Sequence, residues 1–322
     1  MMTKTGKLPS PSRPGRPRGV TAVKAGFSLA AILSAGLVLA QSAPPAPTPV
    51  QPESRTPAST GKAPIQTKSK EEYQAYQTAI ANSLNPPAME KAADDFAARF
   101  PASEVRVLLY RAAMTSYQSI GESQKTMDMG MKVLSIDKDD PEALIGVAEV
   151  LEEHTAPTDL DRGQREREVL EYANHALRTI DTDLAVPSGT PPVKVASYRK
   201  SLRSTALAIL GTIDYKQEHY AEAEAKLRAA LDADPANPDA VVVLRLALAL
   251  DQEKKYSDAL AEATRAVGLT KEDSEIGRMA RNERDHLSSR LGPPPAEPKS
   301  SDPAPPAPSN GATPENGSSP NH

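Results

Sequence analysis

Apolar residues recur at steps of three and four along most of the chain, from residue 70 to residue 291. Short polar breaks separate these runs. A spacing of three and four places apolar side chains along one side of an α-helix. No stretch of this region shows the alternating, β-branched pattern that predicts a strand. The pattern therefore predicts an all-α unit over residues 70–291.

The clearest pair of predicted helices covers residues 204–235. Its first helix carries Gly211, and its second helix carries Ala223 and Ala230 before a closing proline. Small side chains let two antiparallel helices approach closely, and a proline ends the second helix because it has no backbone N–H to donate. The next pair begins at Ala240 with the same order of small and bulky residues, but it lacks the closing proline.

Looser copies of this pattern precede the two clear pairs. One starts near Val107, and another starts near Pro141 and is interrupted by a polar insertion at residues 155–164. The loosest pair comes first, within residues 71–103. The last run, residues 273–291, has one thin apolar side and charges elsewhere. This is the pattern expected of a helix that caps the end of a repeat stack.

The repeated unit resembles the tetratricopeptide repeat, a helix pair of about 34 residues with small residues at fixed positions and a closing proline. The resemblance covers roughly residues 70–291, and residues 204–271 match best. It implies a right-handed superhelical stack of antiparallel helix pairs, a solenoid in which the first helix of each pair lines a concave groove. It also implies that this groove binds a peptide or a helix of another protein.

The resemblance also gives the positions of partner contacts on each first helix. The predicted partner-binding groove comprises eleven residues: Arg111, Thr115, Gln118, Glu149, Glu152, Thr212, Tyr215, Lys216, Leu244, Leu248 and Asp251. Val241, Leu244 and Leu248 would form an apolar binding patch if exposed, whereas a neighbouring repeat or the capping helix would otherwise cover them. The basic clamp with which relatives hold a terminal carboxylate is not expected, because only Arg245 stands in place for it.

The two ends of the chain differ from the helical unit. A basic leader precedes an apolar run at residues 25–40, which predicts a signal peptide or an N-terminal anchor over residues 1–40. Residues 41–69 and 292–322 are rich in proline and are predicted to be a disordered spacer and a disordered tail. Cleavage after Ala40 would give a soluble periplasmic protein, and an uncleaved segment would anchor it in the inner membrane.

Charge and residue content exclude several classes of function. The chain has 38 basic and 42 acidic residues, and its first 40 residues contain bases but no acid. The helical unit is therefore acidic and poorly suited to bind nucleic acid. The chain has no cysteine, which excludes thiolate metal sites and thiol nucleophiles. None of its five histidines has the spacing of a zinc protease. We therefore expect no catalytic residue, no metal site and no cofactor.

One acidic cluster leaves an enzymatic alternative open. Glu149, Glu152, Glu153 and His154 lie within six residues of one another. Charge runs of this kind are usually a solvated helix face. The alternative is an enzyme accessory or an unrecognised hydrolase that uses Glu149, Glu152 and His154.

These features together predict a non-enzymatic interaction scaffold in the cell envelope, with another protein or a peptide as its partner. We expect membrane contact only through an uncleaved N-terminal segment. The alternative is a membrane-tethered envelope assembly factor, because residues 98–105 resemble the aromatic-proline-small turn of envelope-assembly relatives of this repeat family.

Overall fold

The computed structural model of the protein describes residues 61–292. The predicted leader, most of the predicted spacer and nearly all of the predicted tail lie outside these residues. The described residues form eleven helices and no β-strand. The helices are α1 (Lys70–Ile80), α2 (Pro86–Arg99), α3 (Val105–Ser119), α4 (Ser123–Ile136), α5 (Pro141–Glu153), α6 (Arg162–Thr179), α7 (Pro192–Lys216), α8 (Tyr220–Ala233), α9 (Ala240–Gln252), α10 (Tyr256–Gly268) and α11 (Glu275–Leu291). None of these helices is long and apolar enough to cross a membrane.

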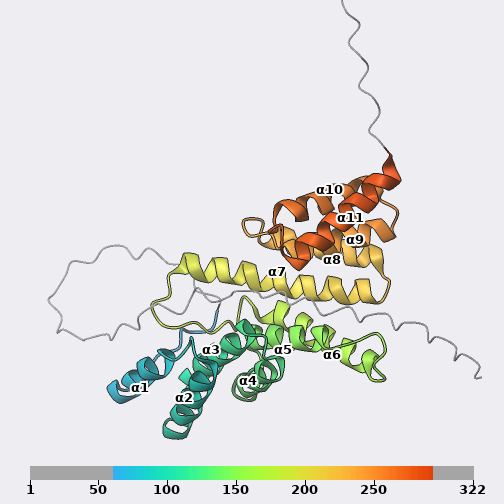
Figure 1. Ribbon diagram of the computed structural model, residues 1–322. Coiled ribbons are helices and arrows are strands. Elements are labelled where there is room, and N and C mark those ends of the chain that lie inside the picture. The colour runs from blue at the N-terminus through green and yellow to red at the C-terminus, as the bar shows by residue number, and fades with distance from the viewer. Residues whose placement is uncertain (1–60, 293–322) are drawn as a thin grey trace, which may run out of the picture.

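The helices pack in consecutive antiparallel pairs. In Figure 1, α7 runs across the middle of the molecule, with α1–α6 on one side and α8–α11 on the other. Each odd-numbered helix also contacts the next odd-numbered helix, from α1 through to α11. The odd-numbered helices therefore form one continuous row, which we call the inner face. The predicted all-α stack of helix pairs is confirmed, and its right-handed superhelical sense stays a prediction.

The small residues that the repeat pattern singled out lie at helix crossings. A Cβ atom added to Gly211 on α7 would lie 2.8 Å from Cγ of Leu227 on α8, closer than carbon atoms pack. Ala223 and Ala230 on α8 are completely buried. Because these residues are small, α7 and α8 approach closely enough for Leu227 to be completely buried as well.

The apolar core is divided into three consecutive clusters. The first joins α1–α5, the second joins α5–α7, and the third joins α7–α11. Each helix is therefore buried mainly by its neighbours in the chain. This is the way a repeat stack is stabilised, since no single central core holds all helices together.

Residues 61–69 correct the predicted boundary of the spacer. Ile65 is only 2% exposed and belongs to the first core cluster. Its backbone N–H donates to the carbonyl of Val186 at 3.0 Å, and its own carbonyl accepts from Ser188 at 3.1 Å. The folded unit therefore begins about nine residues before the first helix, because one apolar side chain and backbone pairing hold this segment in place.

Helix α7 is longer than the repeat pattern predicts. The frame of this pair begins at Ser204, but α7 begins at Pro192. Pro192 stands at the start of the helix, where its missing N–H leaves no bond unmade. The added turns are held by Tyr198, which is 9% exposed, and Leu202, which is 1% exposed. These residues belong to the cluster that joins α5 to α7, so the extension packs on the preceding pair.

Helix α11 caps the C-terminal end of the described stack, as predicted. It packs on both α9 and α10. Two of its own side chains, Ala280 and Leu287, are completely buried. The hydroxyl oxygen of Ser274 accepts a hydrogen bond from the N–H of Gly277 at 3.1 Å, which satisfies one free donor of the first turn. A thin apolar side is enough for this role, because the opposite side faces water.

Candidate partner-binding surface

The structure places the predicted groove residues along the inner face, but it does not leave all of them accessible. Seven are partly exposed: Thr115, Gln118, Glu149, Tyr215, Lys216, Leu248 and Asp251. Four are buried: Arg111, Glu152, Thr212 and Leu244. These four side chains are 2–6% exposed, so they offer a partner little surface. That the eleven residues contact a partner stays a prediction.

Arg111 fastens two helix pairs to each other. Its guanidinium lies 2.9 Å from the carboxylate of Glu142 and 3.6 Å from that of Asp140, and it donates to the carbonyl of Ala185. Burial opposes the charge of Arg111, but Asp140 and Glu142 raise its pKa overall. Burial also raises the pKa of Asp140, to about 6, although Arg111 lowers it. Arg111 is thus a structural ion-pair partner between α3 and α5.

Further polar contacts join α3, α5 and α7. The amide of Gln118 on α3 donates to Glu149 on α5 at 2.6 Å. The ammonium of Lys216 on α7 lies 2.7 Å from the Glu152 carboxylate and 2.8 Å from the Glu152 carbonyl oxygen. Glu152 therefore has a charged partner within the fold.

The same kind of contact continues to the end of the row. Arg245 on α9 donates to the hydroxyl of Thr212 on α7 at 3.0 Å. Arg290 on α11 lies 3.7 Å from Asp251 on α9. From α3 to α11, each odd-numbered helix is linked to the next by at least one polar pair. Many side chains predicted to bind a partner are occupied by this contact between repeats.

The predicted apolar patch is not an open surface. Leu244 is 2% exposed and lies in the third core cluster, against which Leu248 is partly buried. Val241 keeps part of its surface and lines a narrow space between α5, α7 and α9. The alternative in which a neighbouring repeat covers the patch is therefore the correct one for Leu244.

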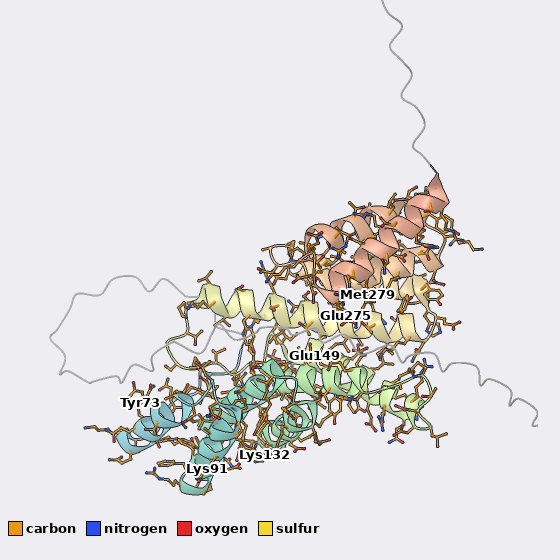
Figure 2. All side chains as sticks on the ribbon, viewed as in Figure 1. Tyr73, Lys91, Lys132, Glu149, Glu275 and Met279 are labelled. Atoms are coloured by element: carbon orange, nitrogen blue, oxygen red, sulfur yellow. The ribbon has the colours of Figure 1, made fainter. Side chains whose placement is uncertain are left out.

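That narrow space is acidic. Its lining includes Glu149, Glu152 and Glu153 of α5, together with Asp239 and Arg245. Glu149 lies on the side of α5 that faces α7 (Figure 2). Burial and the neighbouring Glu153 raise the pKa of Glu149 to about 8, although the hydrogen bond from Gln118 lowers it. At neutral pH most of the Glu149 carboxyl groups are therefore protonated.

The acidic space is much smaller than the pockets in which proteins commonly bind small molecules. Its volume is about 40 Å³, which is room for about three water molecules. His154, the third member of the alternative hydrolase site, is exposed at the end of α5. Within residues 61–292, no three His, Asp or Glu side chains are grouped so that they could hold a metal ion.

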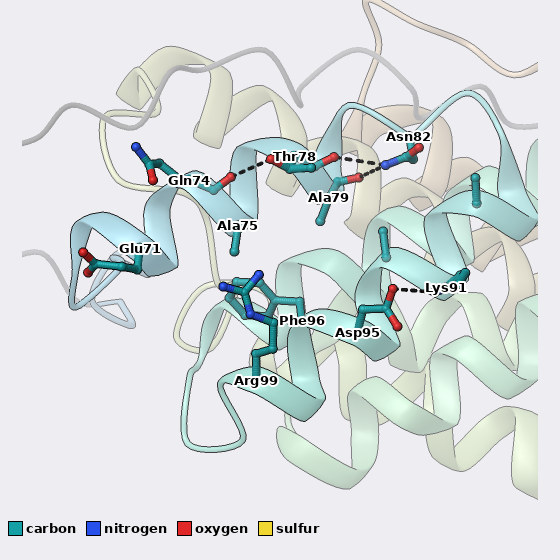
Figure 3. A pocket seen from close by; sticks show the side chains of 12 residues that line it. Glu71, Gln74, Ala75, Thr78, Ala79, Asn82, Lys91, Asp95, Phe96 and Arg99 are labelled. Atoms are coloured by element: carbon teal, nitrogen blue, oxygen red, sulfur yellow. Dashed lines mark hydrogen bonds and ion pairs between the residues drawn. The ribbon is translucent and has the colours of Figure 1, made fainter.

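A larger recess lies between α1 and α2, where the sequence pattern gave no site. Figure 3 shows this recess, which we call the α1–α2 cleft, and its volume is about 570 Å³. Its lining comes from two facing helices: Glu71, Gln74, Ala75, Thr78, Ala79 and Asn82 on α1, and Ala88, Lys91, Ala92, Asp95, Phe96 and Arg99 on α2. Ala79 and Phe96 are buried at its floor, while Ala75, Ala88 and Ala92 remain partly exposed.

Both the floor and the rim of the α1–α2 cleft have distinct chemistry. Four alanines and Phe96 form its apolar part, and the small size of the alanines leaves space that larger side chains would fill. On the rim, Lys91 and Asp95 form an ion pair at 2.6 Å. Glu71 and Arg99 make no ion pair with any residue between 61 and 292, and Arg99 lies over the ring of Phe100. The only sequence signal was the run of alanines between polar residues in α2.

No protein-family model and no curated protein matches the chain. Among solved structures, the chain is similar to a tetratricopeptide repeat protein from Parabacteroides merdae, with 14% identity and a TM-score of 0.35. That alignment covers 68% of this chain and 87% of the other. This chain is also similar to an assembly chaperone of RpL4 (Acl4), with 13% identity and a TM-score of 0.37. The alignment covers 69% of this chain and 97% of the chaperone.

The helix packing decides the architecture. The chain is a tetratricopeptide-like helical stack. Between residues 61 and 292, the helices form consecutive pairs, and the odd-numbered helices form a continuous row. Small residues lie at the crossing of α7 and α8. The recesses of this stack include two of very different size, the acidic space on the inner face and the α1–α2 cleft.

Proposed function

We propose that the protein is a non-enzymatic interaction scaffold of the cell envelope, and that it holds a helix of a partner protein in the α1–α2 cleft. The observation that carries this proposal is the size and lining of the cleft. Its volume of about 570 Å³ is within the range in which proteins bind ligands, and its lining combines four alanines and Phe96 with polar and charged side chains from both helices. A helix with larger apolar side chains along one stripe would fill it.

The position of the cleft supports this proposal. Repeat stacks need a covering element at each end, since every pair exposes an apolar side to its next neighbour. At the C-terminal end α11 covers α9 and α10. At the other end of the described residues, α1 and α2 have no corresponding helix over the cleft (Figure 1). A partner helix in the cleft would do for the first pair what α11 does for the last.

The rim charges indicate what such a helix should carry. Glu71 and Arg99 are both exposed and lie on opposite walls of the cleft. A partner helix with an apolar stripe, a basic residue near Glu71 and an acidic residue near Arg99 would complement both charges. Exposed pairs of this kind contribute about 0–1 kcal/mol each, so they fix orientation while the apolar stripe supplies most of the binding energy.

Affinity capture with matched variants tests the cleft. Thr78 is exposed and lines the cleft, so Thr78→Arg would place a long charged side chain in it without disturbing the core. Gln77 is exposed on the same helix and does not line the cleft, so Gln77→Arg is the control. Captured proteins from an envelope extract would be compared by mass spectrometry among the two variants and the original chain.

We expect one partner to be retained by the original chain and by Gln77→Arg, and to be lost with Thr78→Arg. The proposal fails if the Thr78→Arg chain retains every protein that the Gln77→Arg chain captures. Circular dichroism of both variants establishes that any loss comes from the cleft and not from unfolding.

The location in the envelope rests on the sequence of residues 1–40, and N-terminal sequencing of the mature protein tests it. A mature chain that begins at Gln41 would be exported and soluble. An intact Met1 in the membrane fraction would instead support a membrane-tethered assembly factor. An intact Met1 in the cytoplasm would contradict both.

A further inference from the structure

The residues just before α1 lie extended against the loop between α6 and α7. We call residues 61–65 the strap, and the loop residues 181–190 the strap loop. The N–H of Lys62 donates to the carbonyl of Thr182 at 2.6 Å. Ile65 pairs with the loop in the manner of a parallel strand, through the carbonyl of Val186 and the N–H of Ser188. The strap is thus bound through its backbone at Lys62 and at Ile65.

Three side-chain positions of the strap have specific surroundings. Ile65 is 2% exposed and shares its buried cluster with Tyr76 and Ala185. The ammonium of Lys62 forms an ion pair with Asp137, which follows α4. At Gly61, a Cβ atom would lie 3.0 Å from the guanidinium of Arg199 and 3.2 Å from the carbonyl oxygen of Asp181, so a larger residue there would require its neighbours to move by a few tenths of an ångström. The contacts at these three positions therefore favour a segment with the pattern Gly-Lys-x-x-Ile.

The strap loop is held in place by contacts that do not involve the strap. Arg111 donates to the carbonyl of Ala185. The hydroxyl of Thr190 donates to the carbonyl of Pro187 at 2.7 Å. The N–H of Asp183 donates to the carbonyl of Thr179, at the end of α6, at 2.7 Å. These contacts hold the loop independently of the strap's own hydrogen bonds, so we expect the loop to keep this shape when the strap is displaced.

We propose that the strap loop, together with Asp137, is a binding site for an extended peptide of the pattern Gly-Lys-x-x-Ile, and that residues 61–65 occupy this site as a ligand within the same chain. Backbone hydrogen bonds supply affinity, while the Ile65 pocket and the Asp137 carboxylate supply specificity, as in other cases where a peptide is added along an exposed backbone. Because the strap is joined to α1, it competes at a high effective concentration. A peptide from another molecule therefore binds only when the strap is weakened. This site is independent of the α1–α2 cleft.

A peptide-binding experiment on the full chain tests this inference. The probe is a fluorescein-labelled peptide with the sequence of residues 59–68, STGKAPIQTK. The strap is weakened by Ile65→Asp, which places a carboxylate at a buried position. Fluorescence anisotropy should show that the Ile65→Asp chain binds the peptide about tenfold or more tightly than the original chain does. A peptide that carries the same Ile-to-Asp change should not bind to either chain.

A charge reversal tests the specificity of the site. In the Ile65→Asp chain, Asp137→Lys should abolish binding of the original peptide and permit binding of a peptide with Lys62→Glu. Asp128→Lys is the control, since Asp128 is exposed on α4 and does not contact the strap. Binding of the original peptide should be the same with and without this control change.

Two results would overturn the inference. One is equal binding of the peptide by the original chain and the Ile65→Asp chain. The other is no binding by an Ile65→Asp chain that keeps its helical circular dichroism. If Ile65→Asp unfolds the chain, Lys62→Glu weakens the strap at a side chain that is one-third exposed, and the same comparison is made with that variant.

Discussion

At the residue scale, the closest approach between two helices occurs at Gly211. Gly211→Ala should lower the free energy of unfolding by about 1–2 kcal/mol, since strain against Leu227 outweighs the gain in helix propensity. Gly268→Ala is the matched control, because nothing lies within 4 Å of a Cβ at that position. The control should leave the free energy unchanged or raise it by up to about 1 kcal/mol. Urea denaturation measures both, and equal effects would contradict the packing described.

Arg111 has a structural role, so its replacement should change the stability of the fold. Arg111→Met leaves Asp140, which is completely buried, without its counter-ion. The free energy of unfolding should therefore fall by about 3–5 kcal/mol. Adding Asp140→Asn should recover part of this loss, since the amide carries no charge and can still accept the hydrogen bond from Ala143. If Arg111→Met alone is as stable as the original chain, this role is contradicted.

Glu149 makes stability depend on pH. Its pKa is raised from an ordinary value near 4.5 to about 8, so between these values the folded chain binds more protons at Glu149 than the unfolded chain does. The Glu149 contribution to stability is therefore complete below about pH 4.5 and is lost as pH rises through about 8. Glu149→Gln should flatten this slope and raise stability at pH 8 by roughly 1–2 kcal/mol. Glu171→Gln, at an exposed position of α6, should change neither.

At the scale of helices, the cap provided by α11 depends on a single row of buried residues. Leu287→Ala should lower the free energy of unfolding by about 2–4 kcal/mol, because the side chain is completely buried. Leu291→Ala is the control at the end of the same helix, where the side chain is 42% exposed, and it should change stability by less than about 0.5 kcal/mol. Thermal unfolding of the two variants would show the contrast, and similar losses would contradict the capping role.

The helices and their pairing could be predicted because the apolar spacing and the small residues act locally. Gly211 and Ala223 are small for a steric reason that the sequence displays directly. The accessibility of Arg111 and Glu152 could not be predicted in the same way. Spacing tells which side of a helix a residue occupies, but it does not tell how closely the next repeat approaches that side. At both positions the next repeat supplies a partner.

Two other features were beyond the reach of the sequence pattern. Ile65 is a single apolar residue in a proline-rich segment, so it contributes no periodicity, and its burial depends on a loop more than a hundred residues away in the chain. The α1–α2 cleft depends on the distance between two helices, which the spacing of apolar residues does not specify. Alanine-rich sides are compatible both with close packing, as at Ala223, and with an open recess, as at Ala92.

At the scale of the whole molecule, the described stack has two unlike ends and a strengthened middle. One end is covered by α11 (Figure 1), and the other carries the α1–α2 cleft (Figure 3). Between them, polar pairs link the odd-numbered helices, and the strap joins the start of the unit to the loop before α7. If these links keep the surface preformed, little conformational entropy is lost when a partner binds.

Site-specific photo-crosslinking in living cells tests the central claim most directly. A photoreactive amino acid is placed at Ala88, which lines the α1–α2 cleft, or at Ala98, which is exposed on the same helix outside it. We expect a discrete crosslinked product with one protein when the photoreactive amino acid is at Ala88, and no such product when it is at Ala98. Products from Ala98 alone, or no product from Ala88 in a chain that folds normally, would contradict it.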